Sequence, residues 1–223
     1  MVDLGLHRLR RSRPGRALAA GLSRLGLART SMVVYARPLG STDEEAAQFD
    51  DVPSAVDEMP LDATRSGETP PDVTLDVVRA SELSIRPSPE FEDLAPSDFV
   101  VLARDASAPE SVHGWVFVTL ERPVSVTELS TTVRFDGAYL WGLFVAPSER
   151  ERGVATVLLS RAVAFAGSDR VEAAYALVAA ENAPSRRAFE TVGFEAVDEV
   201  SYQRAFVWER RRGSLHADRE YST

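Results

Sequence analysis

The pattern of hydrophobic and polar positions predicts strands first and helices later along the chain. Short apolar, β-branched stretches between turn residues predict strands, and apolar residues at every third or fourth position predict helices. The predicted strands are Met32–Leu39, Thr74–Arg79, Phe99–Arg104, Gly114–Leu120, one near Thr131–Phe135, Ala138–Val145, Val171–Val178, Phe194–Val197 and Arg204–Glu209. The predicted helices are Gly153–Ala166 and Pro184–Val192, and a short irregular or helical stretch ends at Ala95.

The order of these elements predicts the fold class. Several strands come first, a strand–helix–strand–helix unit follows, and two strands end the domain. This order indicates an α+β fold, in which a mixed, mostly antiparallel sheet is flanked by helices and contains one crossover connection. The compact domain is predicted to span residues 73–210, and residues 211–223 are predicted to form a polar tail.

The first 40 residues differ from the rest of the chain in charge. They contain eight arginines and a single acidic residue. After Pro14, Leu18, Leu22 and Leu25 repeat with helical spacing, so residues 1–40 are predicted to be a basic helical arm followed by a strand. A helix docked on the chain's own acidic domain is favoured over one that binds a membrane surface or nucleic acid. An organelle transit peptide is a further interpretation, ranked below these.

Residues 41–72 are acidic and rich in Pro, Ser and Thr, with ten carboxylates and one arginine. Such a segment buries too little apolar surface to offset its chain entropy, so it is predicted to be a disordered linker. All 25 basic residues of the chain are arginine, and the formal net charge is −9. This composition suggests a halophilic source, because salt screens the repulsion between surface carboxylates. Codon bias alone is the alternative explanation.

The residue types that the chain lacks exclude several kinds of chemistry. Without cysteine there is no disulfide, thiolate zinc site or cysteine nucleophile, and without lysine there is no phosphate-loop lysine or Schiff base. The histidines His7, His113 and His216 are scattered without metal spacing, so no metal is expected. No apolar run reaches 18 residues, so no transmembrane segment is expected, and a cytoplasmic location is predicted.

The turn between strand Ala138–Val145 and the following helix is the first candidate site. Gly153 and Ala155 are small and stand at the helix start, where exposed N–H groups and the positive end of the helix dipole favour an anion. Arg150 and Arg152 add positive charge and forked donors. A pyrophosphate fits this arrangement, and an ordinary strand-to-helix connection is the alternative.

Two motifs together resemble the GCN5-related N-acetyltransferase (GNAT) superfamily. The acetyl-CoA loop of that family has the form Arg/Gln-x-x-Gly-x-Gly/Ala, and this chain has Arg150-Glu151-Arg152-Gly153-Val154-Ala155. The family's later signature is Asn-x-x-Ser/Ala-x-x-x-Tyr/Phe-x-x-x-Gly-Phe, and its slots are filled here by Asn182, Ser185, Phe189, Gly193 and Phe194. One helix and one strand separate the motifs, as in the family. The resemblance covers about 73–210 and is firm from 138 to 195.

The resemblance implies an N-acetyltransferase that transfers the acetyl group of acetyl-CoA to an amine of a small molecule or protein by direct attack. The pantetheine arm would lie along the splayed end of strand Ala138–Val145, and backbone N–H groups from about Arg152 to Thr156 would hold the pyrophosphate. A backbone N–H near Phe144 or Val145 would polarise the thioester carbonyl. The cofactor-binding residues that the resemblance implies are Leu143, Phe144, Val145, Arg150, Arg152, Gly153, Val154, Ala155, Thr156, Asn182, Ser185 and Phe189.

The chain departs from the family at the residues that handle protons. Phe189 stands where members often have a tyrosine that protonates the leaving thiolate, and the strand Ala138–Val145 carries no carboxylate. Water or the side chain of Tyr139, Tyr175 or Glu181 is the candidate to transfer protons in place of the missing tyrosine and carboxylate. The catalytic residues are therefore not assigned. A non-catalytic acyl-CoA-binding regulatory module is therefore the alternative function. The acceptor amine is unknown, nucleic acid is not expected as a partner, and a homodimer is considered.

Overall fold

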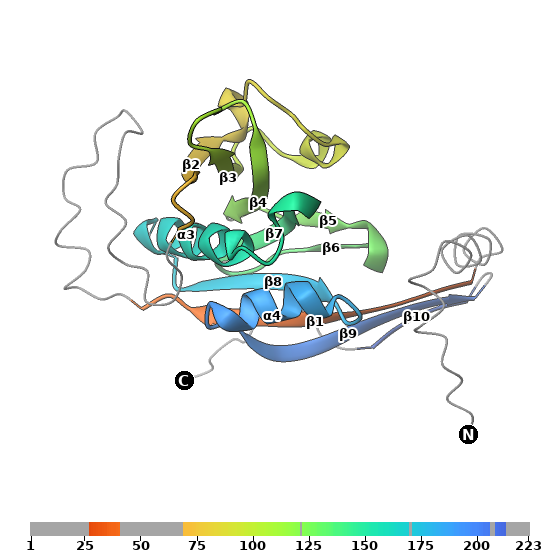
Figure 1. Ribbon diagram of the computed structural model, residues 1–223. Coiled ribbons are helices and arrows are strands. Elements are labelled where there is room, and N and C mark those ends of the chain that lie inside the picture. Colours follow the sequence, from red (N-terminus) through yellow and green to blue (C-terminus); the bar gives the residue numbers. More distant parts are fainter. Residues whose placement is uncertain (1–26, 41–68, 121, 170, 206–207, 213–223) are drawn as a thin grey trace.

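The computed structural model describes residues 27–40, 69–120, 122–169, 171–205 and 208–212, so the predicted arm helix and most of the acidic linker lie outside the described residues. Within these ranges, eight strands form one sheet in the order β10-β9-β1-β8-β7-β4-β3-β2, and β5 and β6 form a separate hairpin (Figure 1). The strands are β1 (Leu27–Pro38), β2 (Val73–Arg79), β3 (Phe99–Asp105), β4 (Val112–Leu120), β5 (Val124–Val126), β6 (Thr131–Val133), β7 (Ala138–Val145), β8 (Ala173–Ala179), β9 (Glu195–Ala205) and β10 (Trp208–Arg212).

Two α-helices and four short 3-10 turns accompany these strands in the part of the chain that the structure describes. They are η2 (Ala80–Glu82), η3 (Pro89–Asp93), η4 (Thr127–Leu129), η5 (Pro147–Glu149), α3 (Val154–Ser168) and α4 (Ala183–Thr191). Neighbouring strands of the large sheet run antiparallel except β7 and β8, which are parallel and joined through α3. The predicted α+β class and mixed, mostly antiparallel sheet are confirmed.

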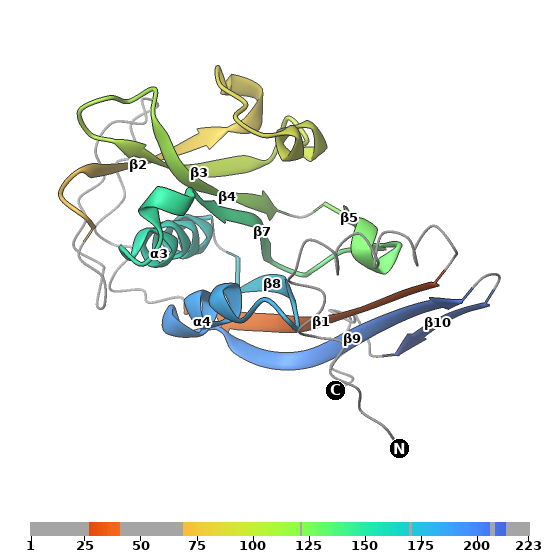
Figure 2. The same cartoon turned by 45° about the vertical axis from the view of Figure 1, so that its right-hand side comes forward.

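The sheet consists of two halves that meet between β7 and β8. Figure 2 shows β2, β3, β4 and β7 in one half and β8, β1, β9 and β10 in the other. Helix α3 packs on the first half, where it contacts β4, β3 and β7, and helix α4 lies beside α3 and over the second half. Each half therefore has one helix on the same face of the sheet.

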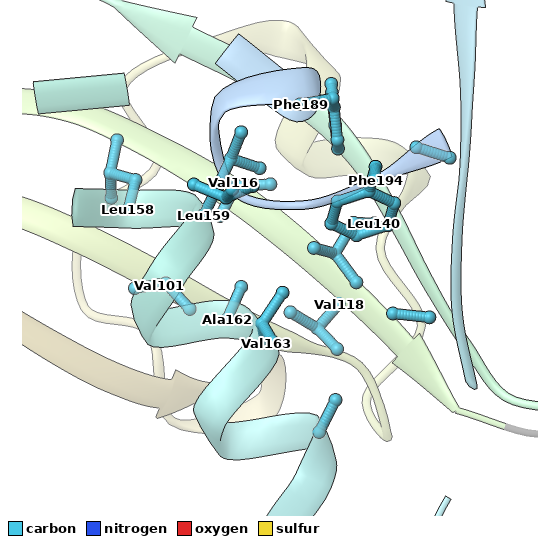
Figure 3. Packing of buried hydrophobic residues seen from close by; sticks show 14 of the residues in the cluster. Val101, Val116, Val118, Leu140, Leu158, Leu159, Ala162, Val163, Phe189 and Phe194 are labelled. Atoms are coloured by element: carbon cyan, nitrogen blue, oxygen red, sulfur yellow. The ribbon is translucent and has the colours of Figure 1, made fainter. Parts of the chain in front are cut away.

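The main hydrophobic core lies between the two helices and this face. Residues two apart on a strand share a face, so Val116 and Val118 point toward the helices, while Trp115 and Phe117 point to the opposite face. Figure 3 shows this core, in which strand residues Val101, Val116, Val118 and Leu140 meet α3 residues Leu158, Leu159, Ala162 and Val163, with Phe189 and Phe194 nearby. Two further clusters lie on the opposite face, under the β5–β6 hairpin and η3.

Strand β1 differs most from its sequence-based prediction. The sequence predicted a strand over Met32–Leu39, beside the arm and outside the compact domain, whereas β1 begins at Leu27 and lies in the sheet between β8 and β9. The buried residues of β1 alternate between the two faces: Val33 and Tyr35 pack toward the helices, and Met32 and Val34 pack toward the opposite face. A strand buried on both faces belongs to the interior of a sheet. The sheet therefore includes a strand that precedes the acidic segment.

The end of the domain also differs from the prediction. A strand was predicted over Arg204–Glu209, but β9 continues to Ala205 and β10 begins at Trp208, so the predicted strand covers the connection between two strands. The prediction was wrong because residues 195–212 contain no Gly, Pro or Asn to mark where one strand ends and the next begins. Strand β10 extends to Arg212, so it includes the first two residues of the segment that was predicted to be a polar tail.

Replacing Tyr35 tests whether β1 is part of the core. Its side chain is fully buried, and its ring stacks on that of Phe189 with centroids 6.2 Å apart. We expect Tyr35→Ala to lower the free energy of unfolding by ~3–5 kcal/mol, as for other large aromatic side chains in cores. Val197→Ala, at an exposed position of β9, should change it by less than about 0.5 kcal/mol. Equal urea midpoints for the two variants would contradict the central position of β1.

Candidate functional site

Strands β7 and β8 pair over a short stretch and then separate. Their parallel ladder joins Ala138 to Ala174, Tyr139 to Tyr175 and Leu140 to Ala176. Beyond Leu140, β7 stays paired with β4 as far as Val145, and β8 stays paired with β1 as far as Ala179. The facing edges of these two described strands carry no ladder bonds beyond Leu140. Backbone N–H and C=O groups on such edges are available to a ligand.

A β-bulge at Gly142 accounts for the separation. One residue lies between Trp115 and Phe117 of β4, but two lie between their partners Phe144 and Trp141 on β7. Gly142 has a φ of +64°, and a Cβ at this position would lie 2.4 Å from the Phe117 ring. Glycine is therefore required both for its backbone conformation and for its lack of a side chain. A bulge bends its strand, and here the bend turns the end of β7 away from β8.

The free edge of β7 presents a backbone donor at Val145. The N–H of Ala146 donates to the carbonyl of His113 at 2.8 Å, so Ala146 faces β4. Backbone groups alternate between the two edges of a strand, and the N–H and C=O of Val145 therefore point away from β4. The Arg150 Nε atom donates to this carbonyl at 3.3 Å. Phe144 and Val145 were the two predicted backbone donors to the thioester carbonyl. The pairing of β7 with β4 directs the N–H of Val145 toward the gap between β7 and β8.

The start of α3 follows directly and leaves several N–H groups without helical partners. Gly153 precedes the helix with a φ of +83°, and no side chain caps the helix start. The first helical bond runs from the N–H of Val157 to the carbonyl of Gly153, so the N–H groups of Val154, Ala155 and Thr156 precede it. Gly153 is exposed, and a Cβ there would meet no atom within 4 Å. The helix start is open to an anion.

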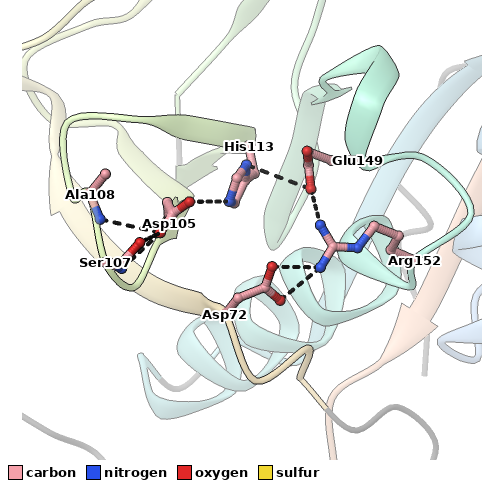
Figure 4. A network of polar contacts seen from close by, with 7 residues as sticks. All are labelled: Asp72, Asp105, Ser107, Ala108, His113, Glu149 and Arg152. Carbon is pink, nitrogen blue, oxygen red and sulfur yellow. Dashed lines mark hydrogen bonds and ion pairs between the residues drawn. The ribbon is translucent and has the colours of Figure 1, made fainter.

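Carboxylates already hold the predicted phosphate-binding Arg152. Figure 4 shows its guanidinium between Asp72, whose oxygens lie 2.6 and 2.7 Å from Nη2, and Glu149, which contacts Nη1. The hydrogen bond with Arg152 holds the pKa of Asp72 below its usual value. His113 lies between two carboxylates, with its Nδ1 atom 3.7 Å from an oxygen of Glu149 and its Nε2 atom 3.8 Å from an oxygen of Asp105.

The second motif forms the start of α4 and part of the core. The Asn182 side chain accepts a hydrogen bond from the N–H of Ser185 at 3.3 Å and caps the helix. Phe189 is 2% exposed and packs against Tyr35 and edge-on against Phe194, with centroids 5.1 Å apart. Asn182, Ser185 and Phe189 therefore each have a structural role in placing α4 at the β8 side of the separation.

The three candidate proton donors lie in different surroundings. Tyr139 and Tyr175 face each other in the paired part of β7 and β8, and both rings pack on Phe135, on the face opposite the helices. Burial raises the pKa of each hydroxyl, with smaller contributions from Glu128 on Tyr139 and Asp136 on Tyr175. This location favours a packing role for both tyrosines. Glu181 is exposed in the turn between β8 and α4, at the open end of the separation.

The structure reveals site residues that the sequence analysis missed. Gly142 carries a recognisable signal, because an isolated glycine within a strand pattern is typical of a bulge. Tyr35 and Arg37 of β1 hold α4: the Tyr35 hydroxyl donates to Glu190 at 2.6 Å, and Arg37 Nη1 donates to the Val192 carbonyl at 2.5 Å. These two residues, like Asp72, carry no local signal, because their partners lie more than 70 residues away in sequence.

No three His, Asp or Glu side chains in the described ranges are grouped in a way that would hold a metal ion. None of the helices described is long and apolar enough to cross a membrane.

The family follows from comparison with known proteins. The model of the acetyltransferase (GNAT) family matches residues 77–194, which is more than half of the chain. The chain therefore belongs to the acetyltransferase (GNAT) family. No curated protein matches the chain as a relative.

Several solved structures are similar to this chain at low sequence identity. A Drosophila protein is 14% identical, with a TM-score of 0.50, over 92% of this chain and 58% of that chain. A GCN5-related N-acetyltransferase from Sphaerobacter thermophilus is 15% identical, with a TM-score of 0.45, over 89% of this chain and 56% of that chain. A predicted acetyltransferase with acetyl-CoA from Clostridium acetobutylicum is 15% identical, with a TM-score of 0.39, over 56% of this chain and 91% of that chain. The chain spans less than two thirds of the first two structures.

Replacing Gly142 tests the bulge. We expect Gly142→Ala to destabilise the protein by at least ~1–3 kcal/mol, because alanine is strained at a positive φ and its Cβ would also meet the Phe117 ring. Gly167→Ala is the matched control: Gly167 lies in α3 with open space around it, so alanine should stabilise by ~0.4–1 kcal/mol. Thermal unfolding measures both. Equal shifts of the two melting temperatures would contradict the role of Gly142.

Proposed function

We propose that this protein is an N-acetyltransferase that transfers the acetyl group of acetyl-CoA to an amine of a small molecule or protein. The observation that carries the proposal is the continuity of two open backbone surfaces. The free edge of β7 ends at Val145, and the uncapped start of α3 follows at Gly153. A long ligand with amides at one end and a pyrophosphate at the other matches such a pair of surfaces.

The residues present fit acetyl-CoA. The edge formed by Leu143, Phe144 and Val145 would pair with the pantetheine amides, and the N–H groups of residues 154–156 would hold the pyrophosphate. Arg150, which reaches the Val145 carbonyl, and Arg152 would add positive charge. The open space at Gly153 leaves room for a phosphate beside the backbone. When bound, acetyl-CoA supplies the reactive acetyl thioester.

The chemistry proposed for these residues is positioning and polarisation. The N–H of Val145, directed toward the separation, would donate to the thioester carbonyl oxygen as negative charge develops there. A neutral amine held beside the thioester would attack it directly, and holding both reactants in place supplies much of the rate. The bond from the acetyl carbon to sulfur breaks as the bond to nitrogen forms. Water would accept the proton that the amine loses and would protonate the departing coenzyme A thiolate, since Phe189 has no proton to give. Lacking a positioned acid or base costs ~10²–10⁴ in rate without abolishing the reaction.

A non-catalytic acyl-CoA-binding module is the second candidate function. The observation that favours it is the burial of Phe189 among Tyr35 and Phe194, which leaves an apolar ring where family members often have a tyrosine. Tyr139 and Tyr175 pack on the face opposite the helices. Both functions require acyl-CoA binding, and only the enzyme releases thiol in the presence of an amine.

Calorimetry with acetyl-CoA, followed by a thiol-release screen of amines, peptides and aminoglycosides, tests the proposal. We expect saturable binding and release of coenzyme A thiol with at least one amine class. Binding without turnover across the whole panel would favour the regulatory module. Folded protein that shows no binding at millimolar acetyl-CoA in high salt would contradict both functions.

Substitution of Gly153 tests the proposed pyrophosphate site. Gly153→Glu places a carboxylate at the start of α3, where it would repel the pyrophosphate, so we expect acetyl-CoA affinity to fall about tenfold or more. Gly153→Gln is the control, because it brings the same side-chain length and the same strain at φ +83° without the charge. If both variants bind acetyl-CoA equally well in calorimetry, the pyrophosphate does not lie at this helix start.

A further inference from the structure

We propose that Asp72 is an internal competitor of acyl-CoA: in the free protein its carboxylate holds the side of the Arg152 guanidinium that the pyrophosphate takes on binding. Asp72 would then lower the affinity of the protein for acyl-CoA. This inference rests on the proposed function and adds to it a residue that sets cofactor affinity. Neither the family motifs nor the predicted site residues include Asp72.

Asp72 holds Arg152 through N–H groups that a phosphate could also use. Both oxygens of Asp72 lie within hydrogen-bond distance of Arg152 Nη2, at 2.6 and 2.7 Å, and Nη1 contacts Glu149 (Figure 4). The N–H groups of a guanidinium donate to carboxylate and phosphate oxygens alike, and Asp72 takes up those of Nη2. The carboxylate of Asp72 therefore occupies a position on Arg152 that suits a phosphate equally well.

The charges around Arg152 oppose the binding of a pyrophosphate. Arg152 lies one residue before Gly153, at the open start of α3, and carries one positive charge against the two carboxylates of Asp72 and Glu149. This group therefore has a net negative charge. A pyrophosphate at the helix start would be repelled while both carboxylates stay in place, and it would gain a forked cation if one of them left.

Asp72, and not Glu149, is the carboxylate that would leave Arg152. The Glu149 side chain is 12% exposed and also lies 3.7 Å from His113, whereas the Asp72 side chain is 48% exposed. The backbone of Asp72 is fixed, because its carbonyl accepts the N–H of Ala106 at 2.9 Å. Release of Arg152 thus needs only the rotation of one exposed side chain, and exposed ion pairs are weak.

The test is the affinity of the full chain for coenzyme A, measured by calorimetry in wild type and in Asp72→Asn. We expect Asp72→Asn to tighten binding about three- to fivefold, a change of the size that loss of an exposed ion pair allows. Asp76→Asn is the matched control. Asp76 lies on β2, the strand that begins directly after Asp72, and its side chain is 47% exposed and pairs with Arg104 at 2.8 Å, so its replacement removes the same charge without freeing Arg152.

A double-mutant cycle separates competition from general charge effects. Arg152→Gln should weaken coenzyme A binding. Adding Asp72→Asn to this variant should raise its affinity for coenzyme A by less than about twofold, because the guanidinium that Asp72 contacts is gone. Equal tightening by Asp72→Asn and Asp76→Asn, or full tightening in the Arg152→Gln background, would overturn the inference. Unchanged or weaker binding by Asp72→Asn would also overturn it. Wild type that binds no coenzyme A would overturn the proposed function and this inference with it.

Discussion

The separation of β7 from β8 is the constraint on which the rest of the structure depends. A parallel pair in the interior of a sheet normally continues its ladder to the end, because unpaired backbone groups are costly when buried. Here the ladder stops at Leu140, and the bulge at Gly142 bends β7 away while β4 still holds its other edge. The sheet thereby leaves a backbone edge without ladder bonds between two of its interior strands. The site that we propose on this edge would consist mainly of backbone groups, and the chemistry proposed for it relies on them rather than on a positioned acid or base.

The two halves of the sheet need separate support once they diverge. Helix α3 packs on the half that contains β7 and brings its open start next to the end of that strand. Helix α4 packs over the half that contains β8. Two side chains of β1 hold the helix there: the Tyr35 hydroxyl donates to the Glu190 side chain, and Arg37 donates to the Val192 carbonyl at the helix end. The strand that precedes the acidic segment thus helps to place the second motif, although it lies outside residues 77–194 that match the family.

Local pattern accounts for what the sequence predicted well. The boundaries of β7 match at both ends, and the buried face of α3 follows its apolar spacing at Val154, Val157, Leu158 and Ala162. Long-range pairing accounts for what was missed. No periodicity in residues 27–38 tells that this strand lies between β8 and β9, and nothing near Arg152 in sequence indicates that Asp72 pairs with it. The predicted cofactor residues stay predictions, as do the arm, the linker and the cytoplasmic location.

Amide hydrogen exchange with and without acetyl-CoA is the most direct test of the central claim that two stretches of backbone form the binding site. The account predicts that acetyl-CoA slows exchange at the N–H of Val145 and at those of Val154, Ala155 and Thr156, while Tyr139 and Tyr175 are unaffected. Slowed exchange confined to the face that carries β5 and β6, with no change at Val145 or at the start of α3, would contradict it.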